Sequence, residues 1–131
     1  MTMLRKEEFM SSELYELKEL DTFTRNIRKF FKKDEARIRE KLKQNLETIP
    51  NRFQMLSGQI TVAGMKLVGL RHIKVGAEGY RGGSVTRFRI CEECLREKYH
   101  VKSKVRCQFC NEKKPRTVVL FDIQPRGFGY R

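Results

Sequence analysis

Apolar residues recur at steps of three or four between residues 12 and 47, which is the period of an amphipathic helix. The recurring positions are Leu14, Leu17, Leu20, Phe23, Ile27, Phe30, Phe31, Ile38, Leu42 and Leu46. Ser11 or Ser12 suits the cap of a first helix, Asp21-Thr22 suits the cap of a second, and Pro50 ends the segment. The pattern therefore predicts either one bent helix or two consecutive helices.

Segments typical of β-strands follow this helical region. Residues 60–62, 65–70 and 73–75 are rich in β-formers and are punctuated by glycine, so they read as short strands. Residues 76–84 are so rich in glycine that we expect a turn or an exposed loop there. Residues 116–123 form an apolar run, which we expect to be the core strand of the C-terminal module.

Two further segments, residues 85–90 and 101–106, alternate between polar and apolar positions, as a half-buried strand does. Each leads directly into a pair of cysteines. The alternation places the basic residues of each segment on one face of its strand. These residues are Arg87, Arg89, Lys102, Lys104 and Arg106.

The four cysteines form two pairs, each with two intervening residues, and twelve residues separate the pairs. They are Cys91, Cys94, Cys107 and Cys110. Two tight turns of this kind supply the four thiolates that a tetrahedral structural zinc site requires, and they leave no ligand position open for catalysis. We therefore expect one Zn²⁺ per chain rather than disulfides or unrelated buried thiols.

The succession of strand, cysteine pair, return strand and second pair over residues 84–124 resembles the zinc-ribbon class of four-cysteine modules. Residues 95–99 also suit a short helix, as in treble-clef-like zinc-finger sites, so both topologies remain open. In either case a small sheet would depend on the ion for its stability. The class serves DNA-binding proteins, RNA-polymerase-associated factors, ribosomal proteins and protein-docking adaptors, and it does not choose among them.

The predicted fold is α+β, with an N-terminal amphipathic helix or helix pair followed by a small antiparallel β domain that carries a four-cysteine zinc module. We expect a helical arm at residues 1–55, β segments with a glycine-rich loop at residues 56–83, and a zinc-binding β module with a basic aromatic tail at residues 84–131. A length of 131 residues excludes a large multidomain enzyme.

The net charge of +13 comes from 29 lysines and arginines against 16 acidic residues, and most of it lies after residue 55. Such a charge attracts polyanions, so the expected partner is nucleic acid (DNA or RNA) or a nucleoprotein enzyme. The predicted phosphate contacts are the basic strand residues named above together with three cations at the turn that follows the second cysteine pair. These three are Lys113, Lys114 and Arg116.

Several classes of protein are disfavoured. No apolar stretch approaches the roughly 20 residues that cross a bilayer, and the first residues lack the apolar core of a signal peptide, which predicts a cytoplasmic protein without membrane contact. His72 and His100 are the only histidines, and no nucleotide-binding loop or nucleophile motif is present. We therefore expect no enzymatic activity.

The leading prediction is a zinc-binding, non-enzymatic nucleic-acid-binding accessory factor in transcription, replication or DNA processing, which contacts phosphates through a basic sheet. One alternative is a protein-docking modulator or inhibitor of a nucleic-acid enzyme. Another is a binder of structured RNA or of the ribosome. In each case the N-terminal helix would be available for homodimerisation or protein docking, although its apolar stripe is equally suited to packing on the β segments.

Overall fold

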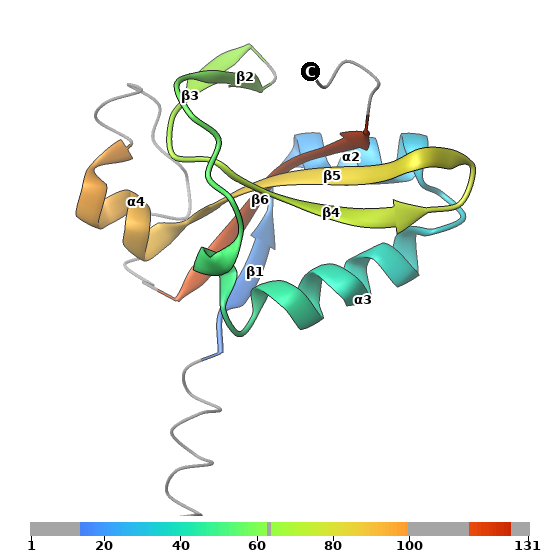
Figure 1. Ribbon diagram of the computed structural model, residues 1–131, viewed down its shortest axis with the longest axis horizontal. Coiled ribbons are helices and arrows are strands. Elements are labelled where there is room, and N and C mark those ends of the chain that lie inside the picture. Colours follow the sequence, from blue (N-terminus) through green and yellow to red (C-terminus); the bar gives the residue numbers. More distant parts are fainter. Residues whose placement is uncertain (1–13, 63, 100–115, 127–131) are drawn as a thin grey trace, which may run out of the picture.

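A four-stranded sheet with two helices packed on one face forms the centre of the molecule, and the fold is α+β (Figure 1). The computed structural model describes residues 14–62, 64–99 and 116–126. The elements in chain order are β1 (Glu16–Glu19), α2 (Asp21–Phe30), α3 (Glu35–Leu46), the 3-10 helix η1 (Pro50–Arg52), β2 (Ile60–Val62), β3 (Met65–Leu67), β4 (Arg71–Ala77), β5 (Tyr80–Ile90), α4 (Cys91–Glu97) and β6 (Thr117–Pro125).

The strands of the central sheet lie in the order β1-β6-β5-β4. β5 runs antiparallel to both of its neighbours, and Phe88 lies opposite Leu120 on β6. β1 runs parallel to β6, with Leu17 opposite Val118. The sheet is therefore mixed: β4, β5 and β6 pair antiparallel, as expected for the predicted antiparallel β domain, and β1 adds a parallel pair that was not predicted. β1 and β6, which lie far apart in the sequence, are direct neighbours in space.

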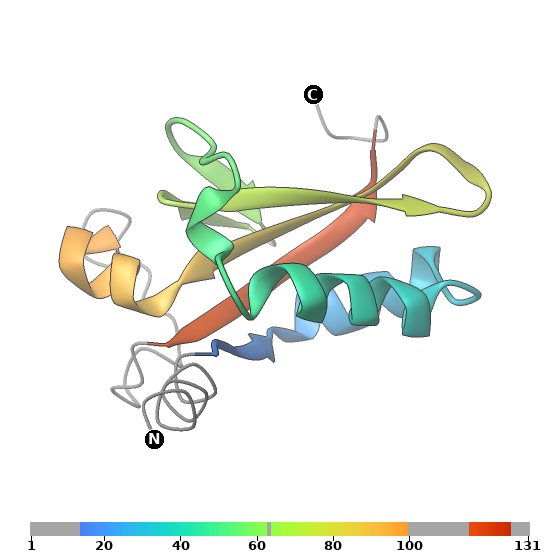
Figure 2. The same ribbon diagram turned by 60° about the horizontal axis from the view of Figure 1, so that its bottom comes forward.

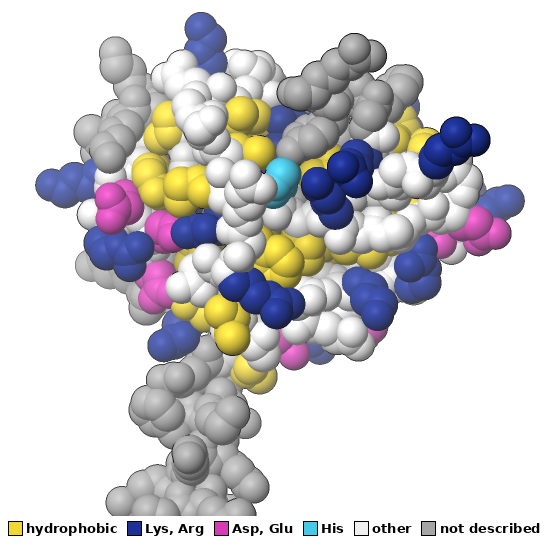
Figure 3. Space-filling view, viewed as in Figure 1, with side chains coloured by type: hydrophobic (Ala, Val, Ile, Leu, Met, Phe, Trp, Pro, Cys, Tyr) yellow, Lys and Arg dark blue, Asp and Glu magenta, His cyan; other side chains and the backbone are white. Residues whose placement is uncertain are grey.

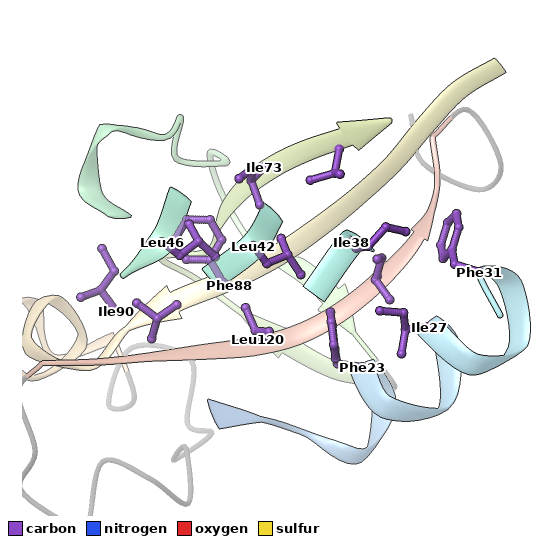
Figure 4. Packing of buried hydrophobic residues seen from close by; sticks show 13 residues of the cluster. Phe23, Ile27, Phe31, Ile38, Leu42, Leu46, Ile73, Phe88, Ile90 and Leu120 are labelled. Carbon is purple, nitrogen blue, oxygen red and sulfur yellow. The ribbon is translucent and has the colours of Figure 1, made fainter. Parts of the chain in front are cut away.

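Helices α2 and α3 cover one face of this sheet (Figures 1 and 2). Their buried apolar residues recur every four positions, which keeps them on one side of each helix. These residues are Phe23, Ile27, Phe31, Ile38, Leu42 and Leu46. They pack against Phe88, Ile90 and Leu120 of the sheet (Figure 4). No helix within the described ranges is long and apolar enough to cross a membrane.

The opposite face of the sheet is covered in part by the β2–β3 hairpin and by α4. The buried residues of this second cluster are Val62, Leu67, Leu70, Cys91, Cys94, Val119 and Phe121. β6 contributes to both cores, because Val118 and Leu120 pack with the helices whereas Val119 and Phe121 pack with the hairpin. A strand buried on both faces has no polar side, which explains the apolar run at residues 116–123.

Residues 16–19 form strand β1, where the sequence pattern predicted helix. The backbone N–H of Glu16 donates to the carbonyl of Arg116 at 2.9 Å, and that of Leu20 donates to the carbonyl of Leu120 at 3.0 Å. Intrinsic helix propensities differ by only about 0.7 kcal/mol among ordinary residues, so an available strand edge overrides them. The rest of the segment forms two helices, which was one of the two alternatives.

The glycine-rich segment at residues 76–84 is mostly strand rather than the expected loop. Ala77 pairs with Tyr80, so only Glu78 and Gly79 form the turn between β4 and β5. Gly83 has a φ of +75°, and a Cβ there would lie 2.8 Å from the carbonyl oxygen of Val75. Glycine is required at this position because the two strands approach each other too closely for a side chain.

The helix–sheet core gives a direct test of the fold. Leu42→Ala removes a side chain that is 1% exposed and leaves a cavity between α3 and the sheet. We expect the free energy of unfolding to fall by about 2–5 kcal/mol. The matched control is Lys41→Ala on the exposed side of the same helix, which should change it by no more than about 0.5 kcal/mol. Urea denaturation of both variants measures the difference, and equal effects would contradict the packing described here.

Candidate functional site

The first cysteine pair lies in the first turn of α4, which follows β5 without a connecting loop. Cys91 and Cys94 are 1% and 0% exposed, and their spacing of three residues places them on the same side of the helix. Both pack with Val119 and Phe121 of β6. The tight turn expected around this pair is therefore the beginning of a helix.

The described residues supply half of the predicted zinc site. Two buried thiols within one helical turn are donors of the type and spacing that a thiolate site uses. Cys107 and Cys110 lie outside the described residues, so the four-ligand arrangement remains a prediction. Within the described ranges, no three or more histidine, cysteine or acidic side chains are grouped so that they could hold a metal ion.

Arg89 lies beside the cysteine pair and is itself 1% exposed. Its Nη1 is 3.8 Å from the Sγ of Cys94, and its Nη2 donates to the carbonyl of Val68 at 2.5 Å. Its guanidinium carbon is 5.4 Å from the ring centre of Phe121 and 5.8 Å from that of Tyr99. Its Nε has no hydrogen-bond partner among the described residues. A buried cation next to a thiol stabilises the thiolate, which is the form that binds metal.

A second arginine, whose side chain is largely but not fully buried, fixes the position of α4. Arg71 on β4 donates from Nε and Nη2 to the two carboxylate oxygens of Glu93 at 3.0 and 2.6 Å. Its Nη1 donates to the carbonyl of Phe53 at 2.6 Å. Glu93 lies between the two cysteines in the sequence, so this two-point ion pair holds the helix that carries them against the sheet.

A third arginine, Arg87 on β5, pairs with Asp122 on the neighbouring strand β6. Its Nε donates to Oδ1 at 2.8 Å, and its Nη2 donates to Oδ2. The two residues are 9% and 4% exposed. Arg87 and Arg89 therefore do not form the exposed row of cations that strand alternation predicted. The alternation itself is correct, but their face of the strand is covered rather than exposed to solvent.

The other predicted phosphate contacts divide into two groups. Arg116 is half-buried, with its guanidinium carbon 5.2 Å from the ring centre of Tyr15. The Tyr15 hydroxyl donates to the carboxylate of Glu92 in α4. Burial, and to a smaller extent this hydrogen bond, raises the pKa of Tyr15 to about 12. The remaining five positions lie outside the described residues. They are Lys102, Lys104, Arg106, Lys113 and Lys114.

The structure brings together exposed cations from segments that are distant in the sequence. The α2–α3 turn meets the β4–β5 turn at one end of the molecule (Figures 1 and 2). Asp34 joins the two turns, because its Oδ2 accepts the backbone N–H of Glu78 at 2.8 Å. We call five exposed cations on the segments that flank this junction, none of which makes an ion pair with a described acidic side chain, the basic end. It comprises Lys32 and Lys33 of the helix turn, Lys74 and Arg81 of the hairpin, and Arg126 after β6.

His72 lies on the same face of β4 as Lys74 of the basic end. Burial lowers the pKa of His72, and the nearby charges of Lys74 and Arg126 lower it further. Figure 3 shows dark-blue lysine and arginine side chains on this view of the molecule, with a cyan histidine side chain next to some of them. Because His72 and Lys74 alternate with Ile73 and Val75, the sequence indicates that these two side chains share one face of the strand, but not which cations from other segments lie nearby.

A cavity of about 340 Å³ lies elsewhere, between β1 and α3. Its lining includes Leu17, Glu19, Arg39 and Leu42. Arg39 donates to both carboxylate oxygens of Glu19, at 2.5 and 3.1 Å. Burial raises the pKa of Glu19, but the hydrogen bonds from Arg39 and Thr24 outweigh this effect and lower it. The carboxylate is thus held ionised in a structural pair, which does not suit it for proton transfer.

Comparison with known proteins does not identify the chain. No protein-family model matches it, and neither the curated proteins nor the solved structures contain a match. The function must therefore be argued from the residues and their geometry.

The Arg87–Asp122 pair allows a test of the ion pairing on the sheet face opposite α2 and α3. Asp122→Leu would leave the Arg87 charge buried without its carboxylate, and we expect the free energy of unfolding to fall by about 3–5 kcal/mol. The double variant Arg87→Met/Asp122→Leu removes both charges and should recover most of that loss. Urea denaturation of the wild type, both single variants and the double variant measures the coupling. Additive effects would show that the two side chains do not interact.

Proposed function

We propose that this protein is a zinc-binding, non-enzymatic nucleic-acid-binding factor that contacts phosphates through its basic end. The observation that carries the proposal is that five exposed cations lie on three segments that the fold brings next to one another, through the contact of Asp34 with Glu78 and that of Gly82 with Arg126. They are Lys32, Lys33, Lys74, Arg81 and Arg126. None of the five makes an ion pair with a described acidic side chain. Unpaired surface cations are available to replace the counterions of a phosphate backbone.

The distribution of acidic residues strengthens this positive surface. Asp34, Glu93 and Asp122 are buried, and each accepts hydrogen bonds inside the fold. As a result, fifteen of the described lysines and arginines are exposed, whereas only five of the described acidic residues are. A surface with this imbalance attracts polyanions over the length of several phosphates.

The contacts around the junction would give the phosphate-binding surface a fixed shape. Arg37 donates from Nη2 to the carbonyl of Gly76 at 2.8 Å and to Oδ1 of Asp34 at 3.1 Å. Phe31 packs on Tyr80, with 5.1 Å between the ring centres. These contacts hold the helix turn and the hairpin together, so that their cations would meet a phosphate backbone without a large loss of backbone entropy. Phosphate contacts of this kind give affinity without sequence preference.

The non-enzymatic part of the proposal is supported by the state of the buried carboxylates. Asp122 is buried in an apolar strand, as a catalytic acid or base often is. Both of its carboxylate oxygens accept hydrogen bonds from Arg87. Glu93 is engaged through both oxygens by Arg71. A carboxylate held in this way stabilises structure rather than exchanging a proton with a substrate.

The zinc part of the proposal is supported by the cysteine spacing and by the surroundings of the first pair. Cys91 and Cys94 are buried together at the start of α4, and Arg89 lies 3.8 Å from one of them. The zinc would supply structural cross-linking, joining α4 to the segment that carries Cys107 and Cys110. Its expected role is to stabilise the fold beside the sheet rather than to contact the nucleic acid.

Nucleic-acid binding is tested by fluorescence anisotropy with single-stranded DNA, duplex DNA and structured RNA between about 50 and 200 mM salt. The variant Lys74→Gln/Arg81→Gln/Arg126→Gln should bind more weakly than the wild type. Its slope of log affinity against log salt should be shallower by about one unit for each phosphate that the variant no longer neutralises. The nucleic acid that binds most tightly would separate the DNA alternative from the RNA alternative.

The matched control removes the same charge elsewhere, as Lys41→Gln/Lys43→Gln/Lys66→Gln at exposed positions outside the basic end. It should retain most of the affinity. Equal losses in the two variants would show that net charge alone attracts the nucleic acid, without a defined surface. Failure of the wild-type protein to bind all three nucleic acids at about 50 mM salt would overturn the proposal and favour a protein-docking modulator.

Metal binding is tested independently of nucleic acid. We expect elemental analysis of the purified protein to find one zinc per chain, and we expect Cys91→Ser and Cys94→Ser to lose it, because each removes a thiolate ligand. Leu95→Ser, at an exposed position in the same helix, is the control and should retain the metal. A strong chelator should lower the unfolding temperature of the wild type. An unfolding temperature that is independent of metal would contradict the proposed role of the ion.

A further inference from the structure

Arg89 differs from Arg71 and Arg87 in the partner that it meets. Arg71 and Arg87 each make a two-point ion pair with a carboxylate. Arg89 is the most deeply buried of the three, yet no described carboxylate pairs with it. Because burying a cation is unfavourable unless other groups offset its charge, the groups that do surround Arg89 matter for the stability of this region.

The neutral contacts of Arg89 satisfy it only in part. The carbonyl of Val68 accepts one N–H, and the rings of Phe121 and Tyr99 offer their electron-rich faces. Its Nε still lacks a partner among the described residues. Among the described residues, a further close contact is the Sγ of Cys94 at 3.8 Å, an atom that becomes an anion when it is a metal ligand.

We propose that Arg89 is the counter-cation of the thiolate cluster to which Cys91 and Cys94 belong, and that it sets the affinity of this centre for a divalent metal. The inference rests on the proposed zinc site. Four thiolates around one divalent ion carry a net charge of −2, which is as unfavourable in an apolar interior as the arginine is. Each charge offsets the cost of burying the other. N–H groups that donate to ligand sulfurs also change the affinity of a site for its metal.

The position of Arg89 also connects the metal centre to the fold. It lies on β5 one residue before the last residue of the strand, and the helix that carries the cysteines follows directly. The ring of Tyr99 that faces the guanidinium leaves no room for a side chain at Gly69, where a Cβ would lie 2.3 Å from the ring. The cation is thereby held in place by both the sheet and its aromatic neighbours.

The test compares full-length wild type, Arg89→Met, Arg89→Lys and the control Arg87→Met/Asp122→Leu, which removes another buried arginine together with its partner. Zinc affinity is measured by competition with a chromophoric chelator at fixed pH, and Co²⁺ spectra report whether the tetrahedral thiolate geometry is retained. Arg89→Met should lower zinc affinity by about 10- to 100-fold. Arg89→Lys should lose less, because it keeps the charge, and the control should bind zinc as the wild type does.

Thermal unfolding without metal separates this role from a merely structural one. Metal-free Arg89→Met should unfold at the same or a higher temperature than metal-free wild type, because the variant no longer buries a cation whose counter-charge depends on the metal centre. If Arg89→Met fails to fold, the zinc affinity and the metal-free unfolding temperature of Arg89→Lys are compared with those of the wild type instead. A loss of zinc affinity with unchanged metal-free stability supports the proposal.

The two proposals fail in different ways. Wild-type protein that binds neither Zn²⁺ nor Co²⁺ would overturn the metal centre, and the role of Arg89 with it. Wild-type protein that binds zinc no more tightly than Arg89→Met would overturn the role of Arg89 alone. A variant whose metal-free stability falls as much as its metal-bound stability would show that Arg89 only packs, and this too would overturn the inference.

Discussion

Three arginines at the sheet, two of them buried and one largely buried, impose the constraint on which much of the structure depends. Each must meet negative charge or electron-rich groups, because an unpaired ion in the interior costs several kcal/mol. Arg71 therefore fixes α4 through Glu93, and Arg87 fixes β5 to β6 through Asp122. Arg89 lies against a cysteine sulfur and two aromatic rings. The position of the cysteine-bearing helix follows from these pairings.

The same pairings shape the surface. Acidic residues that stabilise the interior are not available to neutralise exposed lysines and arginines, so the outside of the protein is more positive than its composition alone implies. Asp34 illustrates the effect, since it is 7% exposed and joins the α2–α3 turn to the β4–β5 turn. By holding these two turns together it creates the basic end while contributing little negative charge to the surface there.

Much of the fold was predictable from local pattern. Residues at a spacing of four, such as Ile38 and Leu42, gave the helices, β-forming composition gave residues 73–75 of β4, and alternation gave residues 85–90 of β5. The helix prediction at β1 was wrong, because residues 16–19 have helix-forming composition and become a strand only where β6 offers backbone partners. The loop prediction for the glycine-rich segment was wrong for a related reason: Gly83 permits close strand pairing as readily as it permits a loop.

The sequence by itself determined the helical periodicity, the strand faces, the thiol pairs and the excess of positive charge, because each is a property of neighbouring residues. Only the tertiary structure decided which strand face is covered and which cations remain exposed. Alternation places Arg87 and Arg89 on one side of β5, but it carries no information about the segments that pack over that side. For the same reason the basic end, assembled from turns some forty residues apart, was not apparent from any local pattern.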